Sequence, residues 1–88
     1  MGEWIYVKDR LPERPDEYLV TSWHRYHYIN EIFSYVTIMT YDSVYQEWHV
    51  DDDSGSYYRL PAYGNDDEKV IAWMPLPDVA IEEGEKND

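Results

Sequence analysis

The amino-acid sequence predicts a mainly β domain, built as a small antiparallel sheet curled into a sandwich or a partly open barrel. Several short segments are rich in β-branched and aromatic residues, the composition typical of strands. Pro, Gly and Asp interrupt them at short intervals, and no long segment has the apolar period of a helix. We expect the sheet to curl because an open sheet of this size would leave its edges exposed.

The first expected strand covers residues 4–7 and the second covers residues 18–23. Between them stand Pro12 and Pro15, each of which lacks an amide donor and restricts the residue before it. Leu11, at the end of the first strand, is expected to reach the core. Residues 15–17 are expected to form the turn into the second strand.

Residues 24–34 are ambiguous. This segment has neither a clean alternation of apolar and polar residues nor a helical stripe, and it contains no Gly or Pro. Two interpretations stay open: an extension of the flanking strands, or one short helical turn.

A hairpin is predicted next, because residues 35–41 form the strongest strand pattern and Asp42 begins a turn. The returning strand, residues 44–50, places Trp48 and Val50 on one face and His49 on the other. Two further strands are expected at 57–60 and 69–74, separated by acidic loops at 51–56 and 64–68.

Length and composition set the domain organisation. We expect the 88 residues to form a single domain over residues 1–81, followed by an acidic disordered tail at 82–88. The chain has no Cys, and it shows neither an apolar run long enough for a membrane span nor a basic signal peptide. We therefore expect a cytoplasmic protein.

Both ends of the chain carry a Trp-containing strand that is followed by Leu-Pro, and we expect the first and last strands to lie side by side. The motifs W-I-x-V-x-x-R-L-P at 4–12, E-Y-L-V at 17–20 and W-M-P-L-P at 73–77 resemble a family of small phage and prophage proteins. That family is catalogued as domain of unknown function 551. The resemblance implies a small bacterial phage or mobile-element domain with no established activity. The long segment from residue 24 and the strong acidity depart from the family's usual pattern.

Metal binding and catalysis are both disfavoured. A calcium loop starting at Asp51 would have Gly55 at its fifth position and Ala62 at its twelfth, and three His without Cys do not make a zinc site. No nucleophile elbow or phosphate-binding Gly loop is present, and His49 beside acidic residues is the best acid–base candidate. We expect no metal, no cofactor and no enzymatic activity.

The aromatic residues and the acidic residues are the candidates for binding. Tyr and Trp dominate protein-binding hot spots, although the same rings could fill a small core. The net charge of −12 disfavours direct contact with nucleic acid or an anionic membrane and favours a basic partner, although solvated loops would also explain acidic runs. The candidate partner-binding residues are Trp23, Tyr26, Tyr28, Tyr35, Asp51, Asp52, Asp53, Asp66, Asp67 and Glu68.

These features favour an acidic binding protein of a phage or mobile element that attaches to and inhibits a host protein. The expected target is a nucleic-acid-binding defence factor with a basic surface. An anti-CRISPR-like protein would inhibit such a factor by blocking that surface or by mimicking nucleic acid. One alternative is a small-ligand-binding domain with an aromatic pocket around Trp23, Trp48 and His49. Another is a self-associating structural protein, for example a homodimer paired through an edge strand.

Overall fold

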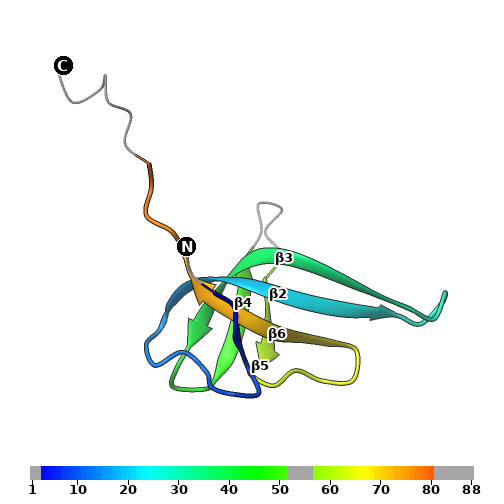
Figure 1. Cartoon of the computed structure of the whole chain (residues 1–88). Helices are drawn as coiled ribbons and strands as arrows, with labels where there is room; N and C mark the ends of the chain where they lie inside the picture. Colours follow the sequence, from blue (N-terminus) through cyan, green and yellow to red (C-terminus); the bar gives the residue numbers. More distant parts are fainter. Residues whose placement is uncertain (1–2, 52–56, 81–88) are drawn as a thin grey trace.

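The computed structural model describes residues 3–51 and 57–80, with only the backbone described at Asp51, Tyr57 and Tyr58 (Figure 1). These residues form one antiparallel sheet in the order β1-β6-β2-β3-β4-β5, and the two described ranges contain no helix. The strands are β1 (Ile5–Tyr6), β2 (Asp16–Tyr26), β3 (Glu31–Asp42), β4 (Glu47–Asp51), β5 (Tyr57–Pro61) and β6 (Glu68–Pro75). The prediction of a mainly β domain with a curled antiparallel sheet is confirmed.

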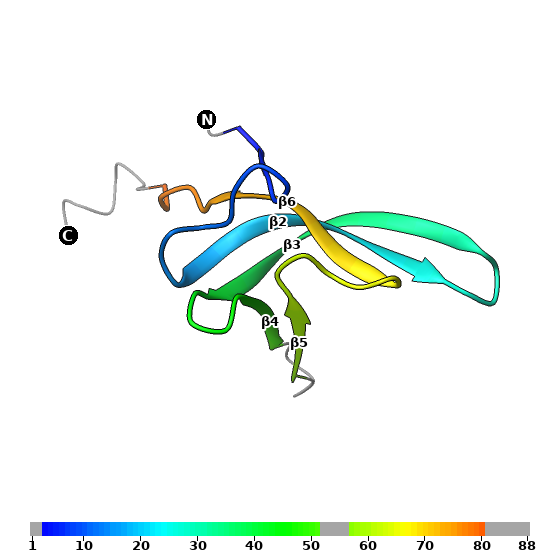
Figure 2. The ribbon, with the colours of Figure 1, turned by 90° about the horizontal axis from the view of Figure 1, so that it is seen from below.

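The sheet is a single layer that curls without closing into a barrel. β4 and β5 turn away beneath β2 and β3, and β5 comes into contact with β6 (Figure 2). The core lies inside the curl, where alternate residues of the strands meet. Its buried members are Val7, Tyr18, Val20, Met39, Tyr41, Trp48, Leu60, Ala62, Val70 and Trp73.

Aromatic rings fill the centre of this core. The ring of Tyr18 stands edge-on to Trp73, with 5.1 Å between centroids, and edge-on to Trp48 at 6.3 Å. Tyr41 packs against the other side of Trp48 at 4.8 Å. The fully buried Trp48 also donates a hydrogen bond from Nε1 to the carbonyl of Ala62 (3.3 Å), which satisfies its polar atom.

The first and last strands lie side by side as expected, because β1 pairs with β6 and places Ile5 opposite Trp73. Trp73 Nε1 donates to the carbonyl of Arg10 (3.0 Å), and the guanidinium of Arg10 lies 5.8 Å from the centre of the Trp73 ring. Leu11 packs against the core, as predicted. The two terminal motifs are therefore in direct contact.

The sequence predicts that the first strand begins at Trp4. In the structure Trp4 precedes the short strand β1, and its side chain is 37% exposed. Ile5 and Val7 face the core, so the two-residue period turns Trp4 and Tyr6 to the opposite face. Of the two tryptophans in the terminal motifs, Trp73 is buried in the core and Trp4 is not. β1 ends at Tyr6, and the chain then turns, with the amides of Asp9 and Arg10 donating to the carbonyl of Tyr6.

Residues 24–34 form the end of a long hairpin, so the strand-extension interpretation is right and the helical turn is wrong. Cross-strand pairing continues from His24 opposite Phe33 to Tyr26 opposite Glu31. A turn over residues 27–30 joins the strands, and its last residue, Asn30, has a φ of 53°, a left-handed conformation that Asn tolerates well. We call residues 24–34 the arm, since they project beyond the other strands (Figures 1 and 2).

The remaining boundaries shift by a few residues. Asp16 and Glu17 already belong to β2, and β4 begins only at Glu47. The predicted turn at Asp42 is present: its Oδ1 accepts hydrogen bonds from the amides of Val44 (2.9 Å) and Tyr45 (3.1 Å). The predicted tail, residues 82–88, lies outside the described residues.

The buried phenols predict a loss of stability in alkali. Burial, and after it the charge of Asp16, raises the pKa of Tyr18 above 10.0, while burial and then Tyr63 raise the pKa of Tyr41. Both phenols are neutral in the folded state, so their contribution to the free energy of unfolding is complete below about pH 10. That contribution is lost as the pH rises through the raised pKa values. The urea midpoint should therefore fall above about pH 10.

The matched variants for this prediction are Tyr41→Phe, which removes a buried ionisable hydroxyl, and Tyr45→Phe, which removes an exposed one. The alkaline fall should become shallower in Tyr41→Phe and stay unchanged in Tyr45→Phe. An equally steep fall in Tyr41→Phe would contradict the assignment.

Candidate functional site

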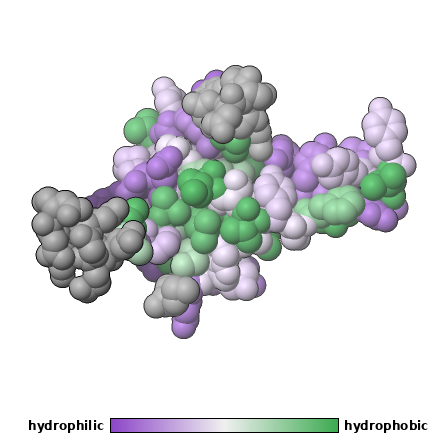
Figure 3. Space-filling model, turned by 90° about the horizontal axis from the view of Figure 1, so that it is seen from above, coloured by the Kyte–Doolittle hydropathy of each residue, from purple (hydrophilic) through white to green (hydrophobic). Residues whose placement is uncertain are grey.

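The arm exposes large apolar side chains. Tyr26 is 49% exposed, Ile29 56% and Phe33 45%, and Tyr28 in the turn is fully exposed. Figure 3 shows hydrophobic residues over the centre of the sheet and again along the projecting hairpin. Contiguous exposed apolar surface on a small protein indicates an interaction site.

The rings on one face of the arm are ordered by their mutual contacts. Tyr26 stands edge-on to His24 at 4.7 Å and to Phe33 at 5.2 Å between ring centroids. Together with Ile29, Tyr26 and Phe33 line a shallow hollow of about 380 Å³. Rings already held in place lose little conformational entropy when a partner covers them.

The loop between β5 and β6 is folded against the base of the arm. Gly64 has a φ of 78°, and an added Cβ would lie 1.9 Å from Cβ of Lys69, so the position requires glycine. The Oδ1 atom of Asn65 accepts hydrogen bonds from the amides of Asp67 (2.8 Å) and Glu68 (2.9 Å). This turn presents the carbonyl of Asp67 to the amide of Arg25, which donates to it at 2.8 Å.

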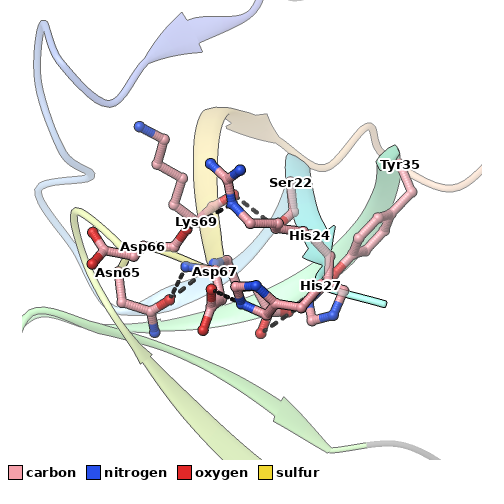
Figure 4. A network of polar contacts seen from close by, with 10 residues as sticks. Ser22, His24, His27, Tyr35, Asn65, Asp66, Asp67 and Lys69 are labelled. Atoms are coloured by element: carbon pink, nitrogen blue, oxygen red, sulfur yellow. Dashed lines mark hydrogen bonds and ion pairs between the residues drawn. The ribbon is translucent and has the colours of Figure 1, made fainter. Parts of the chain in front are cut away.

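Side chains of the same loop reach the arm and the neighbouring strand (Figure 4). His27 Nε2 lies 2.5 Å from Oδ1 of Asp67. Glu68 approaches His24 at 3.9 Å and accepts a hydrogen bond from the hydroxyl of Tyr35 at 3.3 Å. These contacts join the arm to the body of the sheet and fix its direction.

The opposite face of the hairpin carries Trp23 with two cations. Lys69 Nζ lies 5.3 Å from the centre of the indole ring and the Arg25 guanidinium lies 5.9 Å from it. At these distances both cations are attracted to the face of the ring. Trp23 therefore packs with basic side chains, although the chain as a whole is acidic.

The structure brings together six of the ten predicted binding residues around the base of the arm: Trp23, Tyr26, Tyr35, Asp66, Asp67 and Glu68. Tyr28 stands apart at the turn. Asp52, Asp53 and the side chain of Asp51 lie outside the described residues.

Sequence reasoning missed the exposed aliphatic residues Ile29, Ile32, Val36 and Ile38. The sequence pattern that indicates them is in residues 32–39, where apolar side chains stand at both odd-numbered and even-numbered positions and therefore on both faces of the strand. A single-layer sheet can bury only one of those faces.

Trp23, Trp48 and His49 do not share a pocket. Trp48 is fully buried in the core, whereas Trp23 lies on the other face of the sheet. His49 has Glu47 at 3.6 Å and Asp42 at 3.9 Å, and Arg59 lies 3.8 Å from Glu47. This arrangement is a charged cluster on the surface of β3, β4 and β5.

A family match covers almost the whole chain. The family described as "Protein of unknown function (DUF551)" matches residues 3–79. The chain belongs to this family. No curated protein and no solved structure matches it.

In this DUF551 protein, residues of the two terminal motifs and of E-Y-L-V line one apolar groove of about 630 Å³. It lies on the outer face, and its lining consists of Trp4, Leu19, Met74, Pro75, Leu76, Pro77 and Asp78. The groove is the largest of the hollows described above and is separate from the arm.

Within residues 3–51 and 57–80, no three His, Asp or Glu side chains gather closely enough to hold a metal ion. The same part of the chain has no long apolar helix of the kind that crosses a membrane.

The contacts of Asn65 predict a specific loss when its side chain is removed. Asn65→Ala would leave two amides without their acceptor and should lower the free energy of unfolding by about 1–2 kcal/mol. The amide of Arg25 should also exchange faster with solvent, because the carbonyl it contacts is no longer held in place. Urea unfolding and amide exchange measure the two effects.

Asn65→Asp is the matched control, because a carboxylate oxygen can accept the same two hydrogen bonds. It should keep most of the stability and the slow exchange at Arg25. Unchanged exchange in Asn65→Ala would show that this turn does not hold the arm.

Proposed function

We propose that this DUF551 protein is a non-catalytic binding protein that attaches to another protein through the arm and inhibits it by covering its surface. The observation that carries the proposal is the set of exposed rings and aliphatic side chains on the arm, Tyr26, Tyr28, Ile29 and Phe33. Rigid aromatic residues surrounded by polar groups make effective binding anchors.

Charge indicates the chemistry of the partner. A protein with a net charge of −12 is attracted to a basic surface, and it repels nucleic acid. One exposed carboxylate belongs to the arm itself, at Glu31 on β3, and another stands beside it, at Asp66 in the adjoining loop. A host protein that binds nucleic acid, such as a defence nuclease, offers a basic groove of the kind these groups would enter.

The rings and the acids would contribute to different rate constants. Long-range attraction between the acidic chain and a basic groove raises the association rate and weakens in salt. Apolar contacts of the arm slow dissociation and depend little on salt. Attachment over a nucleic-acid groove would block it with one copy of the protein for each partner.

A second candidate function is favoured by the apolar groove. Its volume of about 630 Å³ falls in the range of small-molecule sites, and Trp4, Leu19 and Met74 give it an aromatic and aliphatic lining. An apolar ligand or peptide segment would fit this lining. A ligand-induced rise in melting temperature that Leu19→Ser abolishes and Tyr28→Ala preserves would support this alternative.

The proposed function is tested by capturing host proteins on the immobilised full chain and measuring binding of the captured partner. Tyr28→Ala should raise the dissociation rate about tenfold, the effect of removing a hot-spot ring. Tyr45→Ala is the matched control, because Tyr45 is also an exposed tyrosine in a hairpin turn but lies outside the arm. It should leave the dissociation rate unchanged.

Equal dissociation rates for the two variants would contradict binding through the arm. Asp66→Asn separates the electrostatic part, because it should slow association and reduce its dependence on salt while leaving dissociation unchanged. Capture of no protein in either low or high salt would favour the ligand groove.

A further inference from the structure

One edge of β3 pairs with no other described strand over most of its length. On one side, β2 pairs with β3 from Glu31 to Tyr41. On the other side, β4 pairs only with residues 40–42 before it turns away. Among the described strands, none adjoins that edge over residues 31–39, and Figure 2 shows β3 running on past β4.

This edge lacks the features that usually prevent strands from pairing. Natural sheets protect their edges with charged residues, proline or bulges. Residues 32–41 contain no charged residue and no proline, although 30% of the chain is charged. The register between β2 and β3 also runs without a bulge.

The side chains beside the edge are apolar on both faces of the strand. On the outer face, Val36 is 57% exposed and Ile38 50%, and Ile32 lies on the same face. On the inner face, Phe33 and Tyr35 are also exposed. A strand added at this edge would cover apolar surface on both sides as well as the free backbone groups.

Residues 32–38 are complementary to a second copy of themselves. In an antiparallel pair centred on Tyr35, that residue faces its own counterpart and Ile32 faces Ile38. Ser34 then faces Val36, and Phe33 faces Thr37, so no like charges are opposed. The segment contains no charged residue, and Glu31 lies just outside it.

We propose that two copies of this protein pair edge to edge along residues 32–38 of β3, antiparallel, with the two-fold axis at Tyr35, so that the added strand ends before the positions that β4 occupies opposite Thr40. The pairing places the two β3 strands at the centre of one sheet that continues through β2, β6 and β1 of each copy, while β4 and β5 stay paired at residues 40–42. It goes beyond the proposed function and can be tested separately, because Tyr28 lies in the turn outside the paired segment.

Salt dependence distinguishes this dimer from a complex with a basic partner. Each copy carries a net charge of −12, so the copies repel one another and salt should strengthen the dimer. A complex with a basic partner would weaken in salt.

The absence of Cys makes disulfide trapping a direct test of the register. Directly opposed residues have Cα atoms about 4.5–5.5 Å apart, within the range that a disulfide bridges. Tyr35→Cys alone should therefore oxidise to a covalent dimer. Ser34→Cys and Val36→Cys should each stay monomeric on denaturing gels, because their own counterparts lie beyond about 7 Å, but a mixture of the two should cross-link.

Tyr45→Cys, exposed in a turn away from the edge, is the control for random collision and should cross-link slowly. Faster cross-linking of Ser34→Cys alone than of Tyr35→Cys would overturn the proposed register. No cross-linking above the control at any of these positions would overturn the dimer.

Sedimentation equilibrium of the unmodified full chain gives a second, independent measurement. We expect a dimer whose dissociation constant falls with added salt, and Val36→Lys should convert it into a folded monomer, with folding verified by circular dichroism. Val44→Lys makes the same change at an exposed turn position and should leave the dimer intact. A monomer at every salt concentration, or an unchanged dimer in Val36→Lys, would overturn the proposal.

Discussion

The contacts of Trp73 hold this small sheet together. Its ring packs edge-on against Tyr18, its indole nitrogen donates to the carbonyl of Arg10, and its backbone pairs with Ile5 on one side and Val20 on the other. One residue near the end of the chain thus joins the first strand, the loop after it and the second strand. Because the sheet has a single layer, the core depends on these contacts between the first, second and last strands to cover the rings of Tyr18 and Trp48.

The surface available for binding follows from the lengths of the strands. β6 pairs with β2 only as far as His24, and β4 pairs with β3 only over Thr40–Asp42. The two central strands are therefore longer than the core requires, and their far ends form the arm. The loop that contains Asn65 fixes the base of the arm, so its apolar side chains are exposed on an ordered hairpin.

The sequence was informative where local patterns decide the structure. The alternation around Trp48 placed that ring in the core and His49 on the other face, and the paired terminal motifs indicated that the first and last strands adjoin. It was ambiguous at residues 24–34, because apolar and polar residues do not alternate there and the left-handed turn uses Asn30 instead of glycine. The contact between His27 and Asp67 joins residues far apart in the chain and leaves no local pattern.

The central claim is that the core forms without the arm, which we propose serves contact with other molecules. Urea unfolding of a variant in which Asn-Gly replaces residues 25–32 tests it most directly, because this two-residue turn keeps His24 opposite Phe33. We expect a folded protein that unfolds in one cooperative transition with a midpoint close to that of the full chain. An unfolded or aggregated variant would contradict this claim, because it would show that the arm is needed to form the core.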